Sequence, residues 1–95
     1  MIYDGNKTVA ASGTRERLSS VHKIAAWITF QPLAANTNAV YIGGSTVSAT
    51  SGLSMLVGDS AVTWPVSDIN GYDLYEIWID GATNGNGVQF IYFTR

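Results

Sequence analysis

The sequence predicts an all-β fold, a small antiparallel β-sandwich or jelly roll with an extended N-terminal arm. Residues that favour strands are abundant, with 3 Trp, 5 Tyr and 3 Phe among many Val, Ile and Thr. About seven short apolar runs are separated by Gly-, Asn- and Ser-rich turns, a spacing typical of sandwiches. The one helix-like segment, residues 13–20, is too short to form a stable helix.

The first 20 residues are predicted to form an extended arm and a loop, because they contain few large apolar side chains. An edge strand is expected near residues 8–11. The sandwich domain is then expected to span residues 21–95. A chain of 95 residues has room for one hydrophobic core, so we expect no second domain.

Residues 22–31 are predicted to form the first long strand. Alternation places Ile24, Ala26, Ile28 and Phe30 on one face and Trp27 among small and polar residues on the other. Pro32 is expected to end the ladder, because it has no N–H to donate.

The middle of the chain alternates short strands with turns. We expect strands at residues 39–43, 53–57 and 61–65, a short strand or bulge at 45–48, and a loop at 67–73. Residues 74–80 and 88–94 are expected to pair as a hairpin. The Asn- and Gly-rich segment 81–87 between them tolerates positive φ angles, as hairpin loops require.

The chain carries little charge, and this favours a protein that buries surface against other protein. Only 13% of residues are charged, and the net charge is −2. A solvated monomer usually carries more charge, so we expect a homo-oligomer, a dimer or a trimer. A net-acidic chain argues against nucleic-acid binding. The apolar runs fall far short of the ~20 residues of a membrane span, and no signal peptide is apparent, so we expect no membrane partner and a cytosolic origin.

Residues suited to catalysis or metal binding do not form a recognisable pattern. Cysteine is absent, and His22 is the single histidine, which argues against Cys-based and His-rich metal sites. No Gly-x-Ser-x-Gly elbow accompanies His22, and most acids lie in turns. The loop that begins at Asp80 differs from a calcium-binding EF-hand loop, which would need ligands where Ala82 and Ile91 stand. We therefore expect no enzyme activity, no cofactor and no metal.

The aromatic residues are the better functional signal, because a thin sandwich cannot bury all of them. Exposed Trp and Tyr side chains on a β-face mark contacts with protein or with sugar rings. Low charge favours protein contact, with sugar stacking as the second interpretation. The candidate contact residues are Ile2, Tyr3 and Val9 in the arm, together with Trp27, Trp64, Tyr72 and Trp78.

Several segments resemble a group of small proteins encoded among the head genes of tailed bacteriophages. These segments are residues 7–18, 36–53, 58–60, 74–80 and 84–92, so the resemblance covers nearly the whole chain. Their shared features are turns and strand faces, not catalytic residues.

The resemblance implies a structural virion protein. The expected role is that of a decoration (cement) protein, which oligomerises and stabilises the head shell by non-covalent contact with the major capsid protein. The expected location is the capsid surface, after synthesis in the cytoplasm of the bacterial host. Two alternatives remain open: a carbohydrate-binding module displayed on a virion, and a head–tail connector or tail component.

Overall fold

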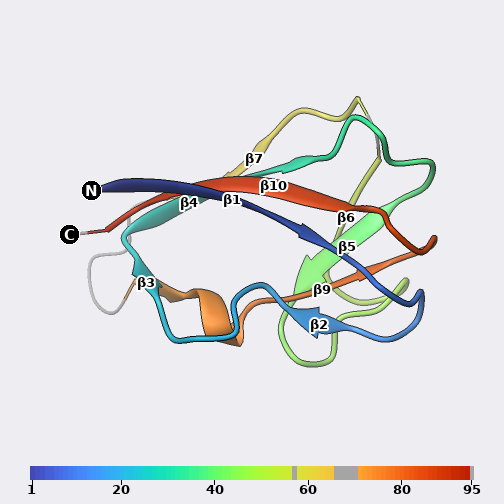
Figure 1. The fold of residues 1–95 in the computed structure, drawn as a ribbon, viewed down its shortest axis with the longest axis horizontal. Coiled ribbons are helices and arrows are strands. Elements are labelled where there is room, and N and C mark those ends of the chain that lie inside the picture. The colour runs from blue at the N-terminus through green and yellow to red at the C-terminus, as the bar shows by residue number, and fades with distance from the viewer. Residues whose placement is uncertain (57, 66–70, 95) are drawn as a thin grey trace.

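The chain folds as an all-β sandwich, which confirms the predicted fold class. The structure, a computed structural model, describes residues 1–56, 58–65 and 71–94. Two four-stranded antiparallel sheets lie face to face, and both chain ends lie at the same end of the first sheet (Figure 1).

The first sheet has the order β1-β10-β4-β7 and the second has the order β2-β9-β5-β6. The strands of the first are β1 (Ile2–Thr8), β10 (Gly87–Phe93), β4 (Trp27–Pro32) and β7 (Val62–Trp64). Those of the second are β2 (Glu16–Arg17), β9 (Trp78–Gly81), β5 (Val40–Gly43) and β6 (Leu53–Met55). A separate pair joins β3 (Ile24–Ala25) to β8 (Tyr72–Asp73), and a 3-10 turn, η1 (Leu74–Glu76), follows β8.

The core lies between the inner faces of the two sheets, as strand alternation requires. Its largest fully buried members are Phe30 and Ile28 from β4, Ile42 from β5 and Met55 from β6. Every second residue of β4 and of β5 is buried, so the alternation in the sequence correctly identified these inward positions.

The N-terminal segment is extended, but it belongs to the sandwich, and the predicted boundary at residue 20 is wrong. All seven residues of β1 pair with β10, from Ile2 opposite Phe93 to Thr8 opposite Gly87. Val9 is fully buried in the core cluster, and so is most of Leu18. The segment looks like a free arm in the sequence because an edge strand needs few large apolar side chains.

The long strand predicted at residues 22–31 is broken at Ala26, which separates β3 from β4. The Ala26 N–H donates to the Phe93 carbonyl at 2.6 Å, and both Ala25 and Ala26 are buried. This irregular residue shifts the alternation by one position. Ile24, which was expected on the core face, is therefore 50% exposed.

The predicted hairpin is also wrong, because β9 and β10 lie in different sheets. The segment between them crosses from one sheet to the other and is held by Val9, which donates to the Asn86 carbonyl and accepts from the Gly85 N–H. The first part of the predicted 74–80 strand is instead η1, whose first turn is capped when the Asp73 carboxylate accepts from the Tyr75 N–H.

The shorter predicted strands are partly reproduced. Strands occur within the predicted segments 39–43, 53–57 and 61–65, and β4 ends at Pro32. Segment 45–48 contributes a single bridge, Ser48 to Ser51. Two residues of the predicted 67–73 loop form β8, while residues 57 and 67–70 of the predicted elements lie outside the described part.

Candidate interaction surface

The outer face of the first sheet divides into an apolar end and a polar end. The strand register aligns Ile2, Phe93 and Trp27 in one row across β1, β10 and β4. The next row holds Asp4, Ile91 and Thr29, and a further row holds Asn6, Gln89 and Gln31. All of these side chains point away from the core, because alternate residues of a strand face opposite sides of the sheet.

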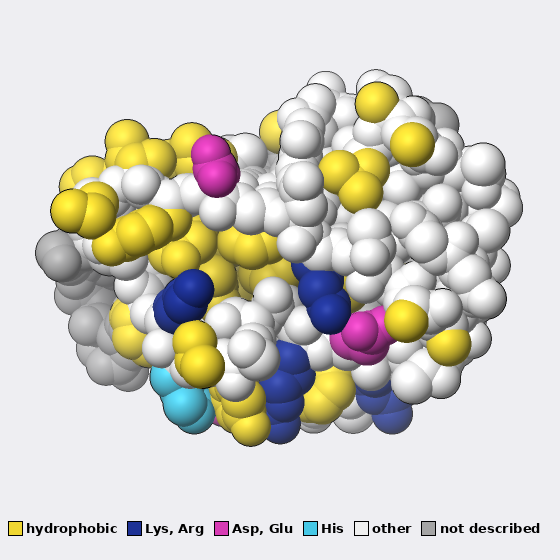
Figure 2. All heavy atoms as spheres, in the orientation of Figure 1, with side chains coloured by type: hydrophobic (Ala, Val, Ile, Leu, Met, Phe, Trp, Pro, Cys, Tyr) yellow, Lys and Arg dark blue, Asp and Glu magenta, His cyan; other side chains and the backbone are white. Residues whose placement is uncertain are grey.

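The apolar end forms a patch that we call the terminal patch, made of Ile2, Trp27, Ile91 and Phe93. Three of these side chains are exposed, by 59% for Ile2, 38% for Ile91 and 36% for Phe93. Figure 2 shows hydrophobic side chains gathered at the end of the molecule where the two termini lie. The rings of Trp27 and Phe93 are parallel to within 3°, with centroids 6.3 Å apart. A contiguous patch of this kind is typical of a contact surface.

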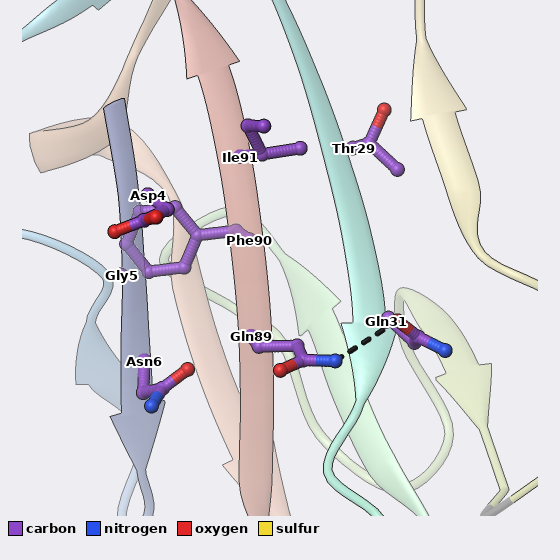
Figure 3. A pocket seen from close by; sticks show the side chains of 8 residues that line it. All are labelled: Asp4, Gly5, Asn6, Thr29, Gln31, Gln89, Phe90 and Ile91. Carbon is purple, nitrogen blue, oxygen red and sulfur yellow. Dashed lines mark hydrogen bonds between the residues drawn. The ribbon is translucent and has the colours of Figure 1, made fainter. Parts of the chain in front are cut away.

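A shallow groove of about 420 Å³ lies beside the terminal patch on the same face. Figure 3 shows that its side chains come from three neighbouring strands, with Asp4 and Asn6 on β1, Gln89 on β10, and Thr29 and Gln31 on β4. The Gln89 amide donates to the Gln31 side-chain oxygen at 2.9 Å. The groove therefore presents amide and carboxylate groups that can bond a polar ligand or a polar protein segment.

The seven residues predicted as contacts do not come together. Ile2 and Trp27 belong to the terminal patch. Tyr3 lies on the inner face of β1, stacks on Tyr92 with centroids 5.3 Å apart, and remains 43% exposed. Val9 is fully buried, so its prediction as a contact is wrong: the chain enters the core as soon as β1 ends.

The remaining three are half-buried and packed on neighbours within the chain. Trp64 meets Phe30 edge-on at 4.9 Å, and Tyr72 donates its hydroxyl to the Pro65 carbonyl at 2.7 Å. Trp78 stacks against Arg17, whose guanidinium carbon lies 4.4 Å from the Trp78 ring and 3.7 Å from the Tyr75 ring. These contacts hold the three rings in place. Trp27 is half-buried as well, but it lies beside the exposed side chains of Ile2 and Phe93.

Ile91, Phe93 and the groove amides were not identified as surface residues from the sequence. Alternation correctly assigned Gln89, Ile91 and Phe93 to one face of their strand. It could not predict which of the two faces is exposed, because both faces carry apolar side chains.

A second cluster brings His22 together with Asp73 and Glu76, with one potential ligand atom of each within 4.8 Å of the others. The Asp73 carboxylate already accepts bonds from the His22 ring, the Tyr75 N–H and the Lys23 N–H. Desolvation raises the pKa of Asp73, but these bonds outweigh it and hold the pKa below its ordinary value. This carboxylate therefore has a structural task, to join β3 to η1.

Within the described part of the chain, no helix is long and apolar enough to cross a bilayer. Comparisons of the chain with protein-family models, with curated proteins and with solved structures give no match.

Proposed function

We propose that the chain is a structural virion protein of a tailed bacteriophage, a decoration protein that docks on the head shell through its terminal patch. The proposal joins the sequence resemblance to one structural observation. That observation is the contiguous apolar patch of Ile2, Trp27, Ile91 and Phe93 on the outer face of the first sheet, of which all but Trp27 are exposed.

The physical basis is the burial of apolar surface against the major capsid protein. Each exposed apolar side chain that is removed from water contributes to docking, and aromatic anchors commonly dominate such interfaces. A protein that binds the assembled shell and not its free subunits stabilises the shell by mass action. Such a role needs no catalytic group.

The test is co-sedimentation of the protein with shells assembled from the major capsid protein that accompanies it. The double variant Ile2→Ser/Phe93→Ser should bind about tenfold or more weakly, because it removes two adjacent apolar groups from the patch. Leu56→Ser is the matched control, since Leu56 is 55% exposed but lies outside the terminal patch. Equal loss in both variants, or loss in neither, would refute docking through this patch.

A second candidate function, glycan binding, is favoured by the parallel Trp27 and Phe93 rings beside the amide-lined groove. Sugar rings stack on aromatic faces while amides bond their hydroxyl groups. Tryptophan fluorescence titrated with a glycan panel tests it. Saturable quenching by one glycan, lost in Gln31→Ala and accompanied by no shell binding, would replace the decoration role with this one.

A further inference from the structure

The open edge of β1 is the longest free strand edge among the described residues. The order of the two sheets leaves β1, β7, β2 and β6 at the edges, with lengths of 7, 3, 2 and 3 residues. An edge strand presents a row of unpaired main-chain groups that can template pairing with another strand.

The hydrogen bonds at the two ends of β1 show which of its main-chain groups face that edge. Met1 and Thr94 exchange two bonds, N–H to carbonyl in each direction, and the Val9 N–H donates to Asn86. In an antiparallel ladder the bonded pairs alternate, so Tyr3, Gly5 and Lys7 also bond β10. The N–H and C=O groups of the intervening residues point to the open edge: Ile2, Asp4, Asn6 and Thr8.

We propose that this edge pairs with the β1 strand of a second copy of the chain, antiparallel and centred on Gly5, to join two sandwiches through one continuous eight-stranded sheet. The inference deepens the self-association expected of the proposed virion protein and rests on that function only for its biological purpose. Centring on Gly5 aligns all seven residues of both strands. It forms four bonded pairs, two of Ile2 with Thr8 and two of Asp4 with Asn6.

Charge selects this register over its neighbours. Centring on Asp4 would place two carboxylates directly opposite each other, which is destabilising, and would shorten the overlap to residues 2–6. Centring on Asn6 would shorten it to residues 4–8. With Gly5 at the centre, each Asp4 lies opposite an amide that can donate to it.

The inner face of the edge also suits a second copy. In the proposed register Tyr3 of one chain lies opposite Lys7 of the other, in the closer, non-bonded type of pair. An inward-facing lysine often protects an edge strand from pairing, because its charge would be buried. Here the Lys7 ammonium already bonds Glu16 at 3.0 Å, so its charge is paired before any partner arrives. This pairing leaves the terminal patch of each chain exposed, and the two patches lie at opposite ends of the paired β1 strands.

Sedimentation of the full chain over a concentration series tests the proposal, without any capsid shell. The wild type should reach twice its 10.2 kDa mass. Asn6→Asp should raise the dimer dissociation constant roughly five- to tenfold, because it creates two acid–acid pairs. Gln31→Glu is the matched control: it adds the same charge to the same face, but on the interior strand β4, and it can still accept the Gln89 bond. It should leave the dissociation constant unchanged.

The double variant Asp4→Asn/Asn6→Asp tests the register itself, because it exchanges acid and amide and should restore dimerisation to within about threefold of the wild type. Circular dichroism should show that every variant is folded, as expected for changes at exposed positions. A wild-type chain that stays at 10.2 kDa, an Asn6→Asp dimer as tight as the wild type, or a double variant that is not rescued would each overturn the proposal. Loss of shell docking with an intact dimer would count against the proposed function alone.

Discussion

Asn36 is predicted to be one of the most destabilising polar positions to change. Its side-chain amide donates to the Gly87 carbonyl at 2.8 Å, and its side-chain oxygen accepts from the Gly87 N–H at 2.9 Å. Both residues are buried, and the pair ties the turn after β4 to the first residue of β10. In Asn36→Ala the Gly87 carbonyl keeps its bond from the Leu33 N–H at 3.1 Å, but the Gly87 N–H loses its partner.

The expected cost follows from those two bonds. An orphaned buried N–H costs about 1–3 kcal/mol, and the second lost bond adds about 1 kcal/mol. The free energy of unfolding should therefore fall by about 2–4 kcal/mol, which lowers the melting temperature by roughly 10–25 °C in a domain of this size.

Urea unfolding followed by tryptophan fluorescence measures this difference, and the slope with urea should not change. Asn38→Ala is the control, since the exposed Asn38 makes a single side-chain bond, to Thr83, and should lose less than about 1 kcal/mol. Equal free energies of unfolding in the two variants would show that the two Asn36–Gly87 hydrogen bonds do not stabilise the fold as proposed.

Three further outcomes are expected. Gly87→Ala should disrupt the β1–β10 pairing, because its added Cβ would meet the Lys7 carbonyl oxygen; loss of near-ultraviolet circular dichroism would report it. Deletion of residues 1–18 should abolish cooperative thermal unfolding, because it removes β1 and the buried Val9; a folded truncated sandwich would contradict the architecture. The Ala10 N–H and the Lys7 ammonium hold the pKa of Glu16 below its ordinary value. The ionised Glu16 carboxylate therefore stabilises the fold fully at pH values above its ordinary pKa, and this stabilisation is lost as the pH falls through the lower pKa of the folded state. The melting-temperature gap between wild type and Glu16→Gln should therefore narrow in acid, and a constant gap from neutral to acidic pH would contradict this.

Strand alternation predicted the interior well because burial selects it directly. In β4 and β5 every second residue must be apolar, so the fold class and inward residues such as Ile28 and Ile42 could be read from the sequence. The same rule failed at Ala26, because a single irregular residue exchanges the two faces of a strand and leaves no mark in composition.

The pairing of distant strands could not be predicted, because local turn chemistry does not specify it. The Asn- and Gly-rich segment before β10 correctly indicated a change of direction. A tight hairpin and a crossing between sheets use the same turn residues. What separates them is the contact of this segment with Val9, more than 70 positions earlier in the chain.

The candidate surface was predicted in part for a related reason. Ile2 and Trp27 were identified because large apolar residues stood where few were expected. Ile91 and Phe93 were not, because their strand is apolar on both faces, and only pairing with β1 and β4 determines which face is covered.

In the proposed dimer, alternate residues of β1 serve the stability of the fold and the pairing of two chains. The two effects should therefore be separable by mutation. Residues Tyr3, Gly5 and Lys7 direct their main-chain bonds to β10 and their side chains to the inner side of the sheet. On that side, a Cβ added at Gly5 would meet the Phe90 ring at 2.8 Å. Gly5→Ala should therefore lower the stability of the fold. Asp4 and Asn6 direct their main-chain groups to the open edge and their side chains to the outer face of the sheet. Changes at these two residues should therefore weaken pairing with a second copy and leave the fold intact. A loss of thermal stability in Asn6→Asp equal to that in Gly5→Ala would show that the two tasks are not divided in this way.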